Sequence, residues 1–226
     1  MEPVYQGLIS AAQAMSLWEV IAVILGFAYL ALIMRQNILG WYAAFASTAI
    51  FIYLFWDVKL VMESALNVYY LIMAVYGWWV WRGNAANAGS AEKTDVSVPI
   101  QCWSIQRHAL VIAGVIILSL VTGYSLEKNT DAALPYLDSF TTWGAVITTY
   151  MVTQKVLENW LYWLVIDTVA IYLYLDRELY LVAVQMLVYL VMAFFGWFMW
   201  RKEYQQQQAL VIEQSKVVST EPTKTY

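Results

Sequence analysis

Seven apolar stretches alternate along the chain with shorter segments that hold most of the Arg, Lys, Asp and Glu. They cover approximately residues 18–34, 38–56, 60–81, 109–126, 136–152, 160–175 and 179–200. A helix that spans a bilayer needs about 20 largely apolar residues, and slightly fewer in a tight bundle. The pattern therefore predicts an all-α polytopic membrane protein with seven transmembrane helices.

The composition supports a membrane protein and excludes several other classes. Of the 226 residues, 62% are hydrophobic and only 12% are charged, more apolar surface than a soluble domain of this size can bury. The single cysteine cannot form an internal disulfide, and no metal cluster or cofactor is expected. The net charge of −4 argues against nucleic acid as a partner.

Two segments of the chain resemble each other closely. Residues 38–82 align without a gap to residues 157–201 with 14 identities in 45 positions, and both copies end alike, in YGWWVWR and FGWFMWR. Internal duplication explains this better than biased composition. Each copy ends in Arg at the same membrane face, so the copies are parallel. Parallel copies of three spans need an odd number of spans between them, and residues 109–126 supply one. The prediction is a 3+1+3 arrangement.

The domain organisation follows from this repeat. We expect an N-terminal surface segment at 1–17, a first three-helix bundle at 18–82, a connecting region at 83–135 that holds the linker helix, and a second bundle at 136–202. Residues 203–226 lack apolar periodicity beyond the first turns, which indicates a mobile tail. The N-terminus lacks Lys and Arg, so the first span is expected to remain in the mature protein.

The distribution of basic residues predicts the orientation of the chain in the membrane. With seven spans, one side holds three basic residues, Lys59, Lys128 and Arg177. The other side holds nine: Arg35, Arg82, Lys93, Arg107, Lys155, Arg201, Lys202, Lys216 and Lys224. Cytoplasmic loops carry an excess of Lys and Arg, so the N-terminus is expected outside and the C-terminus in the cytoplasm.

The repeated endings are interpreted first as membrane anchors. Four tryptophans are expected to form a girdle at headgroup depth that Arg82 and Arg201 anchor: Trp78, Trp81, Trp197 and Trp200. Gly77 and Gly196 lie just inside this belt and are expected to allow close helix approach or bending.

Candidate chemistry appears where the copies differ at membrane depth. Asp167 lies near the middle of the sixth span, where an acid costs about 2.5–3.5 kcal/mol, and its counterpart in the first copy is Thr48. Trp160, Trp163 and Asp167 follow at i, i+3 and i+7 and so share one helix face. Two aromatic rings and a carboxylate on one stripe suit a flat organic cation. Trp160, at the start of its helix, could equally be a belt residue.

Two further polar stripes complete the predicted substrate-binding set. Glu63, Asn67 and Tyr70 follow one another at i, i+4 and i+7 in the third span, although Glu63 could equally be a solvated residue at the mouth. Gln185 and Tyr189 form a shorter pair in the seventh span. Repeat-built transporters bind their substrate near mid-membrane, the level of the two tyrosines and of the buried acid. Threonines of the fifth span could line the path: Thr141, Thr142, Thr148 and Thr149.

These residues carry a resemblance to a known family. The segments VLENWLYWLVIDTVAIYLY, AALPYLDSFTTW and LNVYYLIMAVYGWWVW resemble the PnuC family of bacterial vitamin transporters, and the likeness covers roughly residues 18–202. It implies a 3+1+3 fold, a homotrimer in the inner membrane, and facilitated diffusion of a water-soluble vitamin that cytoplasmic phosphorylation then traps.

The resemblance also bears on the substrate. Members that carry nicotinamide riboside resemble this chain but have Asn at the position of Asp167 and Gln at that of Asn67. A carboxylate suits the aminopyrimidine and thiazolium of thiamine, so the sequence favours thiamine, with nicotinamide riboside as the alternative.

Other classes of protein were weighed on the same residues. A proton-coupled carrier in which Asp167 titrates stays open. A neutral-sugar carrier gives little reason for a buried acid. A retinal photoreceptor would need a lysine in the last span, and residues 179–200 contain none. The chain has no Gly-x-x-x-x-Gly-Lys-Ser/Thr loop for ATP, and no enzyme activity is expected.

Overall fold

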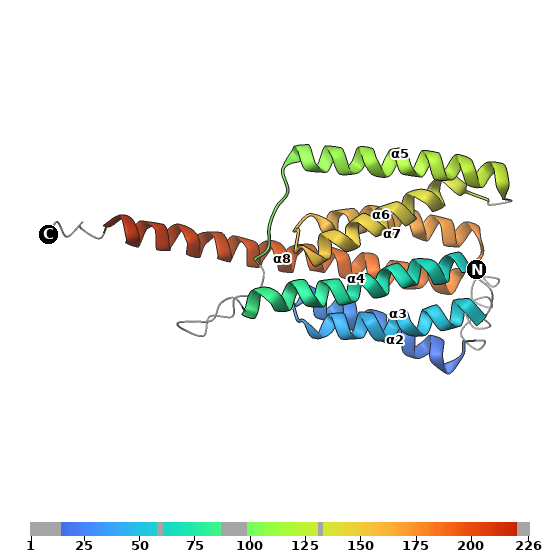
Figure 1. Ribbon diagram of the computed structural model, residues 1–226, viewed down its shortest axis with the longest axis horizontal. Coiled ribbons are helices and arrows are strands. Elements are labelled where there is room, and N and C mark those ends of the chain that lie inside the picture. Colours follow the sequence, from blue (N-terminus) through green and yellow to red (C-terminus); the bar gives the residue numbers. More distant parts are fainter. Residues whose placement is uncertain (1–14, 58–60, 87–98, 131–132, 221–226) are drawn as a thin grey trace.

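The computed structural model describes residues 15–57, 61–86, 99–130 and 133–220; the side chains of 61–63, 83–86 and 215–220 also lie outside the description. The described residues form seven helices (Figure 1): α2 (Leu17–Met34), α3 (Leu39–Asp57), α4 (Val61–Ala86), α5 (Ile105–Asn129), α6 (Pro135–Thr153), α7 (Asn159–Asp176) and α8 (Tyr180–Thr220). The N-terminal surface segment expected at 1–17 lies mostly outside the described residues.

Six of the helices form a closed ring. Each packs on the next in the order α2, α3, α4, α6, α7, α8, and α8 returns to α2. Helix α5 stands outside the ring and packs on α6, which is its place along one edge of the molecule in Figure 1. The side chains that the six helices direct inward therefore line the centre of this ring.

The internal repeat extends over the whole ring. A shift of 119 residues carries α2 onto α6, α3 onto α7, and α4 onto α8, so the α4–α6 and α8–α2 contacts are the same joint repeated. The loops match as well: Gln36 and Lys155 have φ of 54° and 49°, and their backbone N–H groups donate to Ile33 and Val152. The predicted 3+1+3 arrangement is confirmed, with a pseudo-two-fold axis along the centre of the ring.

Local signals in the sequence set several helix starts. Ser16 and Glu19 form a capping box at the start of α2, in which the Ser16 hydroxyl accepts from the Glu19 N–H at 3.2 Å and the Ser16 N–H donates to the Glu19 carboxylate at 2.7 Å. Ser104 accepts from the Arg107 N–H at the start of α5, and Pro135 opens α6.

The outer surface of the ring and of α5 is apolar. Within the described residues, four helices are long and apolar enough to span a membrane by length and composition alone: α2, α3, α5 and residues Tyr180–Gln214 of α8. Helices α6 and α7 carry polar side chains that are buried, among them Thr149 and Asp167. Both of these side chains lie inside the ring, whereas large apolar side chains of α7 are exposed, among them Leu161, Val165 and Leu175.

The expectation that the chain forms no helix beyond the first turns after residue 202 is wrong. Helix α8 continues without a break to Thr220 and projects beyond the other helices (Figure 1). The segment EYQQQQALVIEQ consists mainly of good helix formers, and extending an existing helix requires no new nucleation. The helices on either side of the predicted gap between the apolar stretches 60–81 and 109–126 are also longer than those stretches, because α4 runs to Ala86 and α5 begins at Ile105.

The interpretation of the four repeated tryptophans as one headgroup girdle is wrong for two of them. Trp81 and Trp200 are 5% and 0% exposed and lie between the two bundles. Trp78 and Trp197 are partly exposed, with the guanidinium groups of Arg82 and Arg201 over their rings at 4.9 and 6.0 Å. The sequence pattern indicates depth along the membrane normal but does not show which indole turns inward.

The close approach expected at the repeated glycines is present. A Cβ atom at Gly77 would lie 2.5 Å from the ring of Trp41, and one at Gly196 would lie 2.6 Å from the ring of Trp160. Each glycine therefore gives an indole of the preceding helix room to lie against the backbone.

Candidate substrate-binding site

The ring encloses a central cavity of about 360 Å³. All six ring helices contribute to its lining, and α5 contributes none of the lining residues. Small-molecule sites are typically clefts of about 300–1,000 Å³ with mainly apolar walls and a few placed polar groups. The size and the setting fit one small organic molecule.

Helix α7 supplies the charged wall of this cavity. Trp160, Trp163 and Asp167 all line it, as their shared helix face predicts. Asp167 is only 3% exposed. Within the part of the chain that the structure describes, its carboxylate accepts no hydrogen bond and forms no ion pair. A buried carboxylate without a partner is costly, and a positively charged or hydrogen-bond-donating ligand would offset that cost.

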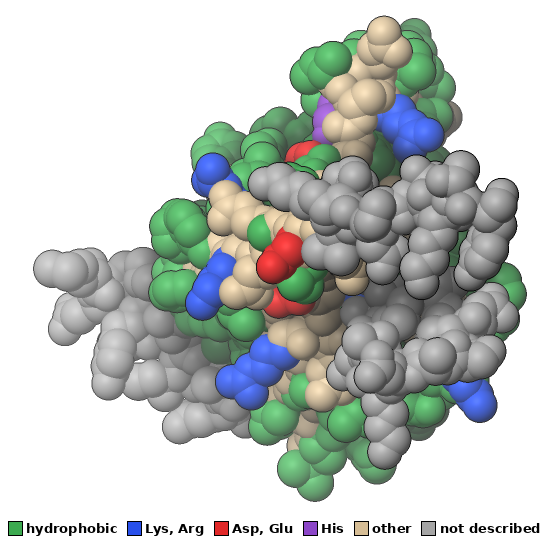
Figure 2. Space-filling view, turned by 90° about the vertical axis from the view of Figure 1, so that its left-hand side faces the viewer, with side chains coloured by type: hydrophobic (Ala, Val, Ile, Leu, Met, Phe, Trp, Pro, Cys, Tyr) green, Lys and Arg blue, Asp and Glu red, His purple; other side chains and the backbone are tan. Residues whose placement is uncertain are grey.

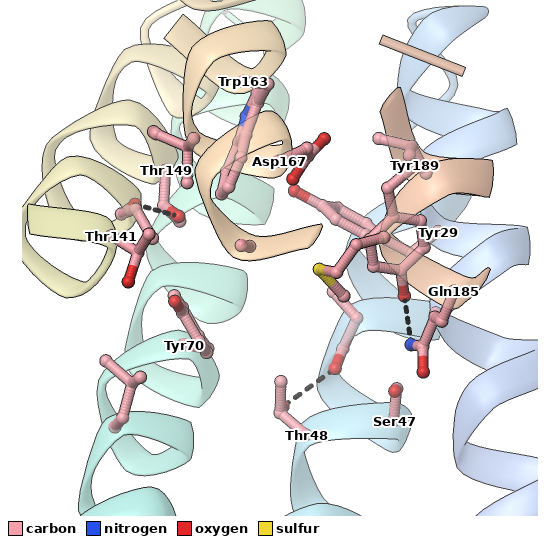
Figure 3. Close-up of a pocket in the computed structure, with 18 of the residues that line it drawn as sticks. Tyr29, Ser47, Thr48, Tyr70, Thr141, Thr149, Trp163, Asp167, Gln185 and Tyr189 are labelled. Carbon is pink, nitrogen blue, oxygen red and sulfur yellow. Dashed lines mark hydrogen bonds between the residues drawn. The ribbon is translucent and has the colours of Figure 1, made fainter. Parts of the chain in front are cut away.

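Tyrosines of α2 and α8 lie beside this carboxylate. Figure 3 shows Tyr29 and Tyr189 close to Asp167, with Trp163 on the same helix and Tyr70 across the cavity. The Gln185 amide donates to the Tyr189 hydroxyl at 3.1 Å. Backbone shape helps here as well, because a Cβ at Gly26 would lie 2.7 Å from that hydroxyl. The absence of a side chain at this glycine therefore makes room for the tyrosine.

Helix α4 completes the wall with Asn67 and Tyr70, and Asn67 is 8% exposed. The side chain of Glu63 lies outside the described residues. Seven residues of the predicted set thus share one cavity: Trp160, Trp163, Asp167, Asn67, Tyr70, Gln185 and Tyr189. That they bind substrate stays a prediction.

The structure adds lining residues that sequence reasoning missed: Tyr29, Ser47, Asp138, Tyr174 and Arg177. Three of the four threonines considered for a path, Thr141, Thr142 and Thr149, also line the cavity. The repeat indicates one further lining residue, Thr48, because it is the counterpart of Asp167 and lies in the same lining. Tyr29 has no such signal, since α2 and α6 share little sequence.

An ion pair marks one end of the cavity, which we call the Arg177 end. An Arg177 Nη atom lies 2.9 Å from an Asp138 carboxylate oxygen, and both side chains are partly exposed. Both residues belong to the second bundle, one in the first turn of α6 and one in the α7–α8 turn. The pair neutralises the arginine charge at this end.

The opposite end, which we call the Lys155 end, is filled by aromatic rings. Four indoles form what we call the tryptophan layer: Trp41, Trp81, Trp160 and Trp200. Pairs within each bundle meet edge to face with centroids 5.3 Å apart, and the Trp81 and Trp200 rings meet across the bundles at 6.5 Å. Figure 2 shows Lys and Arg side chains on this face of the molecule. The exposed basic residues near this end are Arg35, Arg82, Arg107, Arg201 and Lys202.

Lys155 lies under the tryptophan layer and is fully buried. Its Nζ donates to the Gln36 side-chain oxygen at 3.0 Å and lies 4.4 Å from the centroid of the Trp81 ring. Burial lowers the pKa of this loop lysine from 10.5 to about 8, and the nearby Glu203 charge opposes the shift. At pH 7 the amine therefore remains mostly charged.

The described residues contain no group of three or more His, Cys, Asp or Glu side chains that could hold a metal ion. A closed ring of helices around a mainly apolar cavity with a few polar groups fits a membrane transporter. The chain belongs to the nicotinamide mononucleotide transporter family, whose model matches residues 16–202.

Individual relatives are distant but cover most of the chain. The nicotinamide riboside transporter PnuC of Escherichia coli is 20% identical over 204 residues, 80% of this chain and 84% of the relative. The riboflavin/roseoflavin transporter RibM of Streptomyces davaonensis is 25% identical over 158 residues, 68% of this chain and 70% of that protein.

The crystal structure of the vitamin B3 transporter PnuC superposes with a TM-score of 0.67 at 20% identity, over 90% of this chain and 88% of the other. This likeness establishes the shared fold. The sequence-based assignment to the PnuC family is confirmed by these comparisons together.

Proposed function

We propose that this protein carries a cationic water-soluble vitamin across the bacterial inner membrane by facilitated diffusion. The observation that carries the proposal is Asp167, a carboxylate buried in the central cavity with no partner among the described residues. A delocalised cation would neutralise it and stack on the indole of Trp163, a contact worth about 2 kcal/mol once water is excluded.

Thiamine is the first candidate for the substrate. The amino group of its pyrimidine can donate hydrogen bonds to a carboxylate, and its thiazolium supplies the positive charge. Nicotinamide riboside is the alternative, supported by the name of the Escherichia coli relative; its pyridinium carries the charge, and its amide could pair with Asn67 or Gln185. Riboflavin, named for the Streptomyces davaonensis relative, is neutral, so it can donate hydrogen bonds to the buried acid but cannot balance its charge.

The proposal includes an orientation and an assembly. The basic residues around the Lys155 end support a cytoplasmic position for that end and an outside position for the N-terminus, because cytoplasmic loops carry an excess of Lys and Arg. Cytoplasmic phosphorylation of the vitamin would trap it, so the carrier itself needs no energy source. The family resemblance supports a homotrimer, and we include that state in the proposal.

A proton-coupled carrier is the second candidate, and the same observation favours it. A carboxylate buried without a partner can be neutralised by a proton as well as by a cationic substrate. In that mechanism Asp167 would exchange its proton for the vitamin during each cycle. The two candidates differ in whether a pH gradient drives uptake.

The test uses the purified protein and three ligands of different charge and shape. A ligand that binds only the folded state raises its apparent melting temperature, so thiamine and nicotinamide riboside are each compared with riboflavin. We expect a shift with a cation and none with riboflavin; a shift with riboflavin alone would overturn the charge argument. Uptake of the binding ligand into liposomes is then measured with and without a pH gradient. Equal uptake supports facilitated diffusion, and uptake only with the gradient supports proton coupling.

A further inference from the structure

The bond between Lys155 and Gln36 crosses the pseudo-two-fold axis. The two residues are 119 positions apart, the repeat spacing, so each is the counterpart of the other in its bundle. Both occupy a left-handed backbone conformation at the same point of the same loop. A contact between equivalent residues lies on the pseudo-symmetry axis and joins the two bundles directly.

The tryptophan layer ties the bundles together in the same symmetric way. The indole N–H of Trp81, in the first bundle, donates to the Thr153 carbonyl in the second at 3.0 Å. The indole N–H of Trp200, in the second bundle, donates to the Ile33 carbonyl in the first at 3.2 Å. Both acceptors belong to the last turn of a helix, and the Ile33 carbonyl also accepts from the Gln36 N–H. Each bundle therefore donates a capping hydrogen bond to a helix end of the other.

These contacts lie directly beyond the cavity. Trp41 and Trp160 form part of its lining, whereas Trp81, Trp200 and Lys155 do not reach it. All five side chains are at most 5% exposed. A solute held beside Asp167 could leave by the Lys155 end only if the tryptophan layer and the lysine–glutamine bond behind it came apart.

We propose that the tryptophan layer and the Lys155–Gln36 bond form the inner gate of the transporter, and that Lys155 is its central latch. The inference rests on the proposed transport function and on the cytoplasmic placement of the Lys155 end. In the closed gate the lysine also sets a positive charge behind the cavity, which disfavours early escape of a cation. When the bundles separate, the long lysine side chain can extend into water, and the repulsion at the exit falls.

A reversible cross-link between the latch positions tests the gate. The variant carries Gln36→Cys and Lys155→Cys in a Cys102→Ser background, because Cys102 is exposed. A bifunctional methanethiosulfonate reagent, long enough to replace the two side chains, then joins the bundles. We expect the linked protein to retain the thermal shift with the vitamin but to lose at least nine-tenths of its liposome uptake, and reduction to restore uptake. Single-cysteine variants treated identically are the controls.

The outcomes separate the two proposals. If the fully linked protein transports as fast as the unlinked protein, the gate assignment is overturned while the transport function stands. If the unlinked wild-type chain neither binds nor carries a cationic vitamin, the proposed function fails first, and the gate that rests on it fails too.

A second measurement keeps the test decisive if the double-cysteine variant does not fold. Phenylalanine at Trp81 and Trp200 keeps an aromatic ring but removes the N–H donors of both capping bonds. A Thr149→Cys reporter in the cavity should then react at least threefold faster with a membrane-impermeant maleimide applied from the Lys155 side. Trp79→Phe is the matched control, because Trp79 is 64% exposed on the outside of α4. Equal reporter rates in the two variants would contradict the gate.

Discussion

Replacing Asp167 by asparagine removes one buried charge and leaves the shape of the cavity nearly unchanged. A cation about 5 Å from the carboxylate gains about 3 kcal/mol at an effective dielectric constant of about 20. The asparagine oxygen still accepts a hydrogen bond and retains part of that energy. We therefore expect a net loss of about 2 kcal/mol, which raises the Kd for thiamine about 30-fold.

The measurement is equilibrium binding of labelled thiamine to purified protein at pH 7. Asp176→Asn serves as the matched control, because Asp176 belongs to the same helix and carries the same charge but is exposed to solvent. Its Kd should stay close to the wild-type value. The melting temperature of Asp167→Asn without ligand should not fall, since a costly buried charge has been removed.

A change of less than threefold in the Kd of Asp167→Asn, with the protein folded, would refute the reasoning. It would mean that the carboxylate does not face the bound cation, or that a proton already neutralises it. Binding measured at several pH values separates these cases, because a neutralised carboxyl group recovers its contribution at higher pH while a misplaced one does not.

Two further predictions concern stability. Gly77→Ala should lower the apparent melting temperature clearly, because its Cβ would lie 2.5 Å from the Trp41 ring and overpacking of this kind costs about 1–3 kcal/mol. Gly114→Ala on α5 is the control and should raise or maintain the melting temperature, because a Cβ there would have nothing within 4 Å. Equal effects of the two substitutions would contradict the packing argument. The pKa of Lys155 is lowered to about 8, so its charge costs about 3 kcal/mol of stability below pH 8, and this cost falls as the pH rises toward 10.5. The melting temperature of the wild type should therefore rise between pH 8 and 10 relative to that of Lys155→Met, and parallel pH profiles would contradict it.

The helices and the repeat could be predicted from the sequence because both depend on local order along the chain. Apolar length alone indicates the spans, and 14 identities at a constant spacing reveal the duplication. The prediction for the residues after 202 was wrong for a related reason. The apolar pattern ends near residue 202, yet α8 continues because good helix formers can extend an existing helix.

The site could be predicted in part. A charge at mid-membrane depth, as at Asp167, is rare enough to stand out in any sequence, and helical spacing places Trp160 and Trp163 on its face. Spacing within one helix does not show which residues of other helices face it across the cavity. Tyr29 lines the same cavity because α2 contacts α8 in the closed ring, a neighbourhood that spacing along α7 does not reveal.

The sequence by itself determined that the chain is a membrane protein of two parallel three-helix units with a buried acid in the second. Only the tertiary structure decided which indoles are buried in the interior. It also decided that Lys155 contacts its own counterpart Gln36 across the axis. The physical reason is that hydrophobic periodicity measures depth and face for each helix separately. A contact on the symmetry axis joins two bundles, so it forms only when the fold brings together residues that are 119 positions apart.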